Sequence, residues 1–406
     1  MKGVFPFQRL LEVFLYLLFF YLPFSIAVIE TASIVLIAGW LCLRLNPKTR
    51  FKSVWLHEPF RGVLIGVLAF LVACLLSVFL SDHRALSIQG FIRKWLKYLM
   101  LMVVIADFAS SKTIIKRSLL ALAGGSGLVV FEAASQVFFG KGLLRGFAFK
   151  VYQRVTGPYN NPLDLGTFLV VVIPVLFIWA LSILPGNRRK WGWTLLVLLF
   201  ACLLNTEAIG AWLGGSVAIL AVVLSSNDAS VRRKGWLFVC AALLLGCLAL
   251  WKSGRLSDTL SWQEIGKRDR VWMWQDALGM IRDRPLTGHG LNTFMSNYLD
   301  YWVGGERQPR YAHNCYLQLW AETGLVGLGA FCYMIWQLLV FLRNPALRDK
   351  QRQALMQGLV VGLLAFLIQA GVDTNFYSVR QAVLFWSLAG FALAVKSSEA
   401  GDLLAR

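Results

Sequence analysis

The residues best suited to chemistry gather around His313. Asn314, Gln318 and Glu322 follow it at intervals of four residues, a spacing that places them on one face of a helix. A neutral imidazole has an ordinary pKa of about 6.5, so it can take a proton from a hydroxyl group at neutral pH. These side chains therefore predict a reactive or substrate-binding site. The alternative is structural: a helix cap followed by polar side chains whose hydrogen bonds are satisfied within the protein.

Arg270 is the second candidate, because it begins a segment that predicts an amphipathic helix on the membrane surface or against a helix bundle. The apolar positions of that helix recur at helical spacing: Val271, Trp274, Leu278 and Ile281. Backbone amides at a helix start, together with an arginine, can bind phosphate. Pro285 ends the helix, and Gly288 and Gly290 allow a tight turn around His289.

The composition indicates the kind of fold that holds these residues in place. The chain is 58% hydrophobic and only 15% charged, with a mean hydropathy of +0.63. These values are typical of a polytopic membrane protein with an all-α fold. We predict about twelve transmembrane helices from apolar segments of sufficient length. The segments are 10–27, 28–44, 62–80, 86–106, 114–138, 163–184, 191–205, 209–225, 236–251, 315–342, 354–371 and 381–396.

Basic residues in alternate short loops predict the orientation, because such loops stay in the cytoplasm. They occur around Arg44 to Lys52, Lys112 to Arg117, Arg188 to Lys190, Arg232 to Lys234 and Arg343 to Arg352. Both termini are thus predicted to be cytoplasmic, with one large periplasmic loop between helices nine and ten. This division gives three regions: 1–251 with helices one to nine, 252–314 as the loop, and 315–406 with helices ten to twelve and a cytoplasmic tail. We expect no cleavable signal peptide.

The predicted outer face is also basic, and the net charge of the chain is +19. Cations on the translocated side favour an anionic partner such as a phosphate-bearing lipid head group or an acidic glycan, and we expect no nucleic-acid partner. The seven cysteines and four histidines lack the spacing of a metal site, and no Gly-rich nucleotide-binding motif occurs. We therefore expect neither a metal nor a cofactor.

The order of these motifs resembles that of the O-antigen ligase and O-antigen polymerase superfamily of bacterial envelope enzymes. The similar residues are Arg270 with Trp274, then Asp283 to Phe294, and then His313, Asn314, Leu317, Gln318, Glu322 and Gly324. The segment from Arg154 to Pro162 resembles a further, weaker family motif. The resemblance implies a membrane glycosyltransferase fold of the GT-C type. It also implies that His313 and Arg270 are catalytic.

One position departs from that family, whose members commonly carry Ser-Arg-Gly-Ala-Trp between helices seven and eight. Here the segment is Thr206 to Trp212, and Ile209 stands where the arginine is expected. If that arginine holds the donor diphosphate, another cation must replace it. The candidates for binding the donor diphosphate or glycan are Arg154, Arg93, Lys97, Arg268, Asn314, Gln318, Glu322 and His289.

The resemblance implies a metal-independent transferase in the bacterial inner membrane, with its active site facing the periplasm. Its donor would be a glycan on polyprenyl (undecaprenyl) diphosphate, because nucleotide sugars are absent outside the inner membrane. Arginines would neutralise the leaving diphosphate. We expect an O-antigen ligase that uses lipid A-core as acceptor, because one large loop carries the motifs. The alternatives are an O-antigen or exopolysaccharide polymerase with the same donor class, and a lipid or sugar transporter.

Overall fold

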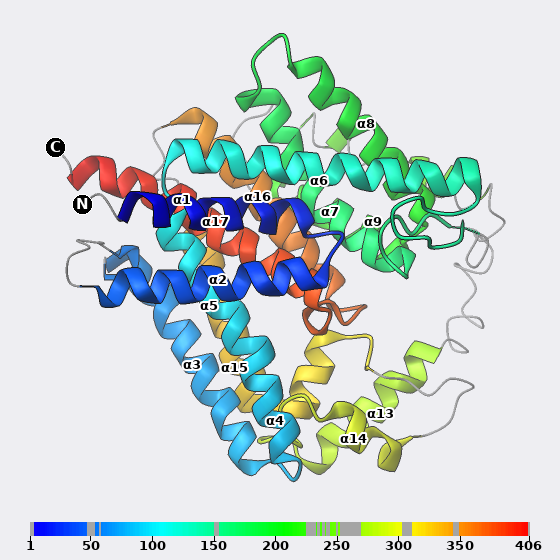
Figure 1. Ribbon diagram of the computed structural model, residues 1–406. Helices are drawn as coiled ribbons and strands as arrows, with labels where there is room; N and C mark the ends of the chain where they lie inside the picture. The colour runs from blue at the N-terminus through cyan, green and yellow to red at the C-terminus, as the bar shows by residue number, and fades with distance from the viewer. Residues whose placement is uncertain are drawn as a thin grey trace.

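The computed structural model describes residues 4–46, 53–56, 58–149, 154–224, 269–302, 311–343 and 349–404, with a few short pieces between 233 and 251. The regular elements among these residues are helices, and the connections between them contain one isolated bridge, between Lys141 and Ala148. The all-α prediction is therefore confirmed. Figure 1 shows long helices packed across one another, with the shorter α13 and α14 at one end.

The helices follow the predicted apolar segments in order. Their bounds are α1 Val4–Tyr21, α2 Ile26–Leu45, α3 Arg61–Leu80, α4 Arg84–Gly90, a π-helical turn Phe91–Leu96, α5 Lys97–Phe108, α6 Lys112–Phe139, α7 Pro162–Ile178, a π-helical turn Trp179–Ile183, α8 Arg189–Thr206, α9 Ile209–Leu224, α13 Asp269–Asp283, α14 Phe294–Asn297, α15 Cys315–Arg343, α16 Lys350–Gln369 and α17 Val379–Leu404. The short 3-10 turns are η1 Val54–Leu56, η2 Glu58–Phe60, η6 Tyr298–Tyr301 and η7 Asn375–Tyr377.

Two predicted boundaries are wrong. The break between the first two helices lies between Tyr21 and Ile26 and not at residue 27, because Pro23 interrupts the chain and the Ser25 side chain caps α2 by accepting a hydrogen bond from Val28 N. The segment 315–342 is not one regular helix either. Gly324 has φ 68° and ψ −176°, so α15 is broken there.

Seven helices in the described part of the chain are long and apolar enough to cross a membrane, and Ile209–Ala221 is a shorter apolar helix. The chain is therefore a multi-pass membrane protein by its helices. The count of twelve spans stays a prediction, and seven of the sixteen residues of the ninth predicted segment, 236–251, lie outside the described residues. Helix α17 is central, because 83% of its membrane-length segment is buried inside the protein, compared with 33% for α2.

The packing brings helices together that are distant in the sequence. Helix α15 packs against α3, α17 against α5, α16 against α7 and α9, and α1 against α2 and α6. Since α15 to α17 come last in the chain and contact helices from its first half, the final three helices hold the bundle together. Leu384 to Leu393 of α17 lie in this core and are almost entirely buried.

Different contacts hold the chain segments together at each end of the bundle. At one end Asp107 accepts hydrogen bonds from Ser53 Oγ and Val54 N, and Lys112 lies 3.8 Å from Asp349. At the opposite end Arg380 donates to the carbonyl oxygens of Pro23 and Pro158. We call this second end, which also carries His313 and Asp373, the outer end. Loops that were predicted to share one side of the membrane thus lie at the same end of the bundle. Which side of the membrane each end faces stays a prediction.

Helix α13 exists where the sequence predicts it, but the face it buries is only partly the predicted one. Ile281 is buried as predicted, Leu278 is exposed, and Ala277 and Met280 are buried instead. The buried side chains contact Phe294, Tyr298, Ala312 and Ala321, in a small core separate from the main one. The face is therefore set by α14 and α15, which pack on α13, and not by its own pattern of apolar residues.

Candidate active site

His313 lies at the outer end, immediately before the cap of α15. The Asn314 side chain accepts hydrogen bonds from Tyr316 N and Leu317 N and so caps this helix. His313 has φ 47°, a left-handed conformation that is uncommon for a residue with a Cβ and is often found at functional positions. Its side chain is 33% exposed, so a substrate can reach the ring.

The ring of His313 pairs with a carboxylate that the sequence analysis did not select. His313 Nδ1 lies 3.1 Å from Asp373 Oδ1, and the Asp373 side chain is only 12% exposed. A carboxylate at Nδ1 favours the tautomer with its proton on Nδ1, which leaves the lone pair of Nε2 available as a base. The arrangement is thus suited to taking a proton from a hydroxyl group. The sequence signal that could have found it is that Asp373 is the single acidic residue of the loop between α16 and α17.

Asp373 is fixed by the start of α15. Cys315 N donates to Ala370 O at 2.8 Å and to Asp373 O at 3.2 Å, and Cys315 Sγ also donates to Asp373 O. The Asp373 carboxylate accepts a hydrogen bond from Thr374 N at 2.8 Å. The loop that carries Asp373 is therefore bonded to Cys315, two residues after His313. These bonds keep the Asp373 carboxylate next to the His313 ring.

Two further charged residues lie beside this pair, and neither was selected as a site residue from the sequence. Asp164, in the first turn of α7, interacts electrostatically with Asp373, Arg380 and His313. The guanidinium of Arg380 lies 4.2 Å from the centre of the Tyr159 ring. Gln381 Nε2 donates to Asp164 O at 2.8 Å and anchors α7 to α17. The starts of α7, α15 and α17 thus together form one charged cluster.

Gln318 and Glu322 bond within the protein. The Glu322 carboxylate is buried and accepts hydrogen bonds from Asn292 N at 2.8 Å, Tyr377 OH at 3.0 Å and Gln318 Nε2 at 3.2 Å. Burial, together with the nearby Glu322 carboxylate, raises the pKa of Tyr377 well above its ordinary value, so the phenol stays protonated and donates. Glu322 therefore joins three segments: the turn before α14, the start of α15 and the loop after α16.

The break in α15 is filled by the turn between α13 and α14. In a continuous helix Leu325 N and Val326 N would donate to Ala321 O and Glu322 O. Here they donate to Pro285 O and Leu286 O, while His289 N and Gly290 N donate to the two vacated carbonyls. A Cβ at Gly324 would lie 2.1 Å from Leu286 O, so this close approach requires glycine.

The remaining predicted residues occupy varied places. His289 is buried, with Nε2 3.0 Å from Met280 O. Arg270 lies in the first turn of α13, and no hydrogen bond or ion pair joins it to His313 among the described residues. Arg268 lies outside the described residues.

The three proposed substitutes for the missing arginine also differ. Arg154 Nε donates to Thr206 O at 2.6 Å and Arg154 Nη2 donates to Glu207 O at 2.9 Å, which places Arg154 at the turn that precedes Ile209. Lys97 pairs with Glu30 at 2.6 Å. Arg93 is exposed on the π-helical turn before α5.

We expect Asp373→Asn to lower the rate of any reaction that uses His313 as a base. The amide can offer its NH2 group to Nδ1, which favours the wrong tautomer, and it cannot stabilise a protonated ring. The expected loss is about a hundredfold or more in turnover, with little change in thermal stability. Turnover of purified protein measured across a pH series tests this. An unchanged rate and pH profile would show that Asp373 only shapes the loop.

Comparison with known proteins agrees with the resemblance read from the motifs. Residues 194–332 match the family described as O-antigen ligase. A protein of Rickettsia conorii, provisionally named a polysaccharide ligase, is 22% identical over 79% of this chain and 77% of its own length. An uncharacterized protein of Haemophilus influenzae is 24% identical over 46% of this chain, and that match spans half of the relative's length. The resemblance is thereby confirmed, and an O-antigen ligase-type function is supported at the level of the family. Asp164, Asp373 and Arg380 lie outside the matched residues.

Proposed function

We propose that this protein is an O-antigen ligase that transfers a glycan from undecaprenyl diphosphate to lipid A-core. The observation that carries the proposal is the His313–Asp373 pair, in which a reachable ring is held by a nearly buried carboxylate. The segment that matches the family ends within α15 and includes His313. The pair supplies the base that glycan transfer to a hydroxyl requires.

The proposed reaction is a single displacement. The acceptor hydroxyl oxygen attacks the anomeric carbon of the donor sugar and forms the new glycosidic bond, while His313 Nε2 takes its proton. The bond between that carbon and the diphosphate oxygen breaks, and its electron pair leaves with the carrier diphosphate. Asp373 stabilises the imidazolium that forms, and arginines neutralise the charge that develops on the leaving group.

The proposed cations for the diphosphate are Arg270 and Arg154. Arg270 lies in the first turn of α13, and backbone amides at a helix start can bind phosphate together with an arginine. Arg154 donates to Thr206 O and Glu207 O at the α8–α9 turn. These two residues come shortly before Ile209 in the chain. Lys97 is a further candidate, and its ammonium pairs with Glu30. We also propose that Arg93, Arg268 and Asn314 contact the donor, as the sequence predicts. Gln318, Glu322 and His289 were predicted for the same role, but they are buried and bonded within the protein, so we propose that they anchor the site.

The site is proposed to face the periplasm from the inner membrane. The outer end joins the predicted outer loops, and the basic loops meet at the other end. A lipid carrier would bring an activated glycan to that side, so neither a nucleotide sugar nor a metal is invoked. Membrane lipids surround the bundle through its exposed apolar side chains.

We expect Arg270→Lys to lose much of the transfer activity although the charge is kept. A lysine ammonium cannot reproduce the planar two-point contact that a guanidinium makes with phosphate oxygens. The expected loss is about tenfold to a hundredfold in kcat/KM, with the larger share in donor binding. Steady-state transfer measured over a series of donor concentrations tests this. The matched control is Arg282→Lys, at an exposed position in the last turn of the same helix. Equal kinetics for both variants would contradict the role of Arg270.

Deletion of the protein in its host, followed by electrophoresis of lipopolysaccharide, tests the function itself. Loss of a ligase leaves bare lipid A-core together with carrier-linked polymer. Loss of a polymerase leaves core with one repeat unit, and loss of a transporter stops delivery of the glycan altogether. Restoration by wild-type protein but not by a His313 variant would support the ligase. The one-repeat pattern would instead assign the polymerase activity.

A further inference from the structure

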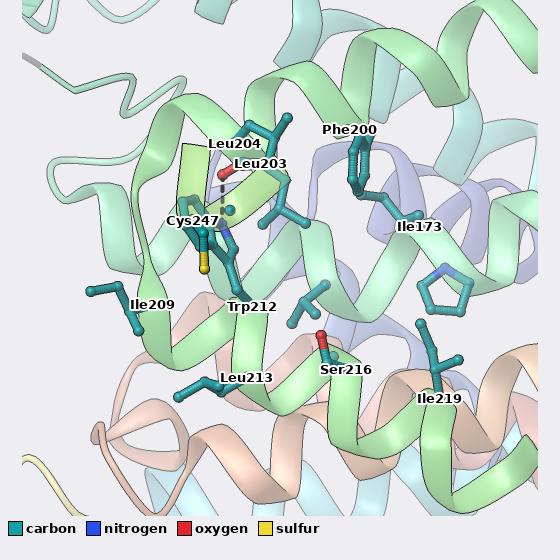
Figure 2. Close-up of a pocket in the computed structure, with 14 residues that line it drawn as sticks. Ile173, Phe200, Leu203, Leu204, Ile209, Trp212, Leu213, Ser216, Ile219 and Cys247 are labelled. Atoms are coloured by element: carbon teal, nitrogen blue, oxygen red, sulfur yellow. Dashed lines mark hydrogen bonds between the residues drawn. The ribbon is translucent and has the colours of Figure 1, made fainter. Parts of the chain in front are cut away.

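Cavities in different parts of the bundle differ in what lines them. Figure 2 shows the cavity between α7, α8 and α9, whose lining, including Phe200, Trp212 and Ile219, carries no charge. A second cavity, of about 120 Å³, lies between the starts of α6 and α16. It is at the end of the bundle where α1 begins and α17 ends (Figure 1), which we call the inner end. Charged side chains line this second cavity.

Cations outnumber carboxylates around the inner cavity. Lys112 and Lys116 come from α6, and Arg352 comes from the first turn of α16. Asp349 is the one carboxylate in the described lining, and it caps α16 by accepting a hydrogen bond from Gln351 N at 2.9 Å. Its ion pairs with Lys112 Nζ and Arg352 Nε are both long, at 3.8 Å. The cavity therefore keeps positive charge that its own carboxylate does not neutralise.

Arg352 is the residue that most strongly indicates a bound anion. Its side chain is only 9% exposed and lines the cavity. Within the part of the chain that the structure describes, its guanidinium makes no hydrogen bond, and its one partner is the distant Asp349 carboxylate. An arginine carries five N–H donors, and buried donors are normally bonded, because an unpaired buried charge is costly. An anion in the cavity would supply the missing acceptors.

The two helix starts add to the positive potential. Helix α6 begins at Lys112 and α16 at Lys350, and neither has an acidic residue in its first turn. The free backbone N–H groups at a helix start bind anions, and the helix dipole places partial positive charge there. Cations in a first turn are unfavourable for the same reason. An anion between the two starts would offset this repulsion.

The membrane side of the cavity is apolar. Ile115 and Leu355 line it and are buried, and both come later in their helices than the charged residues. Leu120, one turn beyond Lys116 on α6, is 60% exposed, as expected for a side chain that faces lipid. The volume suffices for a phosphate group, because a water molecule needs only about a tenth of it. Cations at the mouth and apolar side chains below them suit a phospholipid head group better than a free ion.

From this geometry we propose that the inner cavity binds the phosphate of an anionic phospholipid. Arg352, Lys112 and Lys116 would hold the phosphate oxygens, and an acyl chain would follow α6 past Leu120. The lipid would bridge α6, which packs on α1 and α8, to α16, which packs on α7, α9 and α17. The inference does not rest on the proposed function, because the cavity and His313 are at opposite ends of the bundle.

Native mass spectrometry of the purified full-length protein in detergent tests this with dioleoylphosphatidylglycerol and dioleoylphosphatidylcholine. The two lipids share their acyl chains and a phosphate, but only phosphatidylglycerol has a net negative charge. Wild-type protein should bind it at least about fivefold more tightly, the factor that one basic residue near a lipid surface contributes. Lys116→Gln should weaken its binding about fivefold, and Arg352→Gln about tenfold, because hydrogen bonds to a charged group are lost.

Lys350→Gln is the matched control, because Lys350 is an exposed lysine in the first turn of α16 that does not line the cavity. This variant should keep the wild-type affinity. Lys116 is also exposed, so its substitution tests the site without disturbing a buried residue, as Arg352→Gln does. Equal affinity of wild-type protein for both lipids would overturn the inference. So would unchanged binding of phosphatidylglycerol by both Lys116→Gln and Arg352→Gln.

Inorganic phosphate distinguishes a lipid from a free anion. Phosphatidylglycerol should raise the midpoint of thermal unfolding of the wild-type protein, because a ligand of the folded state stabilises it. Inorganic phosphate at the same concentration should not, since it lacks the apolar part. An equal rise with inorganic phosphate would overturn the assignment to a lipid. Neither measurement involves glycan transfer, so failure of the proposed ligase and failure of this inference are seen separately.

Discussion

His313→Asn should abolish transfer while the protein stays folded and still binds the lipid donor. Asparagine is among the residues that tolerate a left-handed backbone, so the φ of 47° at this position costs little in the variant. Its amide cannot act as a base, so the expected loss is about a hundred- to ten-thousandfold in kcat. Because the base acts in the chemical step, the affinity for the donor should change little. Single-turnover transfer and donor binding, measured separately on purified protein, give the two quantities.

His313→Ala serves as a second variant with a different backbone preference. Both variants should lose transfer to a similar extent, although alanine is less suited to the left-handed conformation and should lower the thermal stability slightly. Transfer at the wild-type rate by either stably folded variant would show that the polar residues at the start of α15 are structural. The proposed mechanism would then have to be abandoned.

Glu322→Ala should cause the largest loss of stability among the polar residues at the start of α15. Its removal leaves Asn292 N, Tyr377 OH and Gln318 Nε2 without the acceptor that they share in a buried place. Each unsatisfied buried donor costs about 1–3 kcal/mol, so the combined loss should be at least about 3 kcal/mol. Thermal unfolding followed by tryptophan fluorescence in detergent should show a clearly lower midpoint. Transfer should fall as well, because the turn before α14 and the loop that carries Asp373 lose a common anchor.

Glu322→Gln separates this anchoring role from contact with a substrate. The amide oxygen can still accept from Asn292 N and Tyr377 OH, which bond the same oxygen of Glu322, whereas Gln318 Nε2 bonds the other oxygen and would face the NH2 group. Glu322→Gln should therefore lose less stability than Glu322→Ala and keep most of the transfer activity. If Glu322 instead contacts a substrate, Glu322→Gln would lose transfer at wild-type stability. Unfolding of Glu322→Ala at the wild-type temperature would contradict the anchoring role.

The sequence alone determined the class of this protein and much of its order. Apolar segments of membrane length predicted the helices, because a backbone in lipid must satisfy its own hydrogen bonds and so becomes helical. Local signals also located α13 and the capped start of α15, since caps and turn residues act over only a few positions. His313 and Arg270 were selected from an ordered motif, and the family match covers both.

The partners of these residues could not be predicted in the same way. Asp373 lies sixty residues after His313, and Asp164 lies in another helix again. Sequence spacing gives the face of one helix, whereas contacts between helices depend on how the whole bundle packs. For the same reason the buried face of α13 was predicted only in part, because α14 and α15 decide which of its sides is covered.

The polar residues of α15 show what sequence spacing can predict and what depends on tertiary packing. Their spacing of four residues correctly placed Gln318 and Glu322 on one face, but only the tertiary structure revealed that this face meets Tyr377 and the backbone of Asn292. The break at Gly324 was likewise hidden, because the hydrogen bonds that replace those of the helix come from Pro285 to Gly290. The sequence thus determined which groups the protein carries and on which helices they lie. Packing between distant segments decided which of them bond to one another, since a hydrogen bond depends on distance in space and not along the chain.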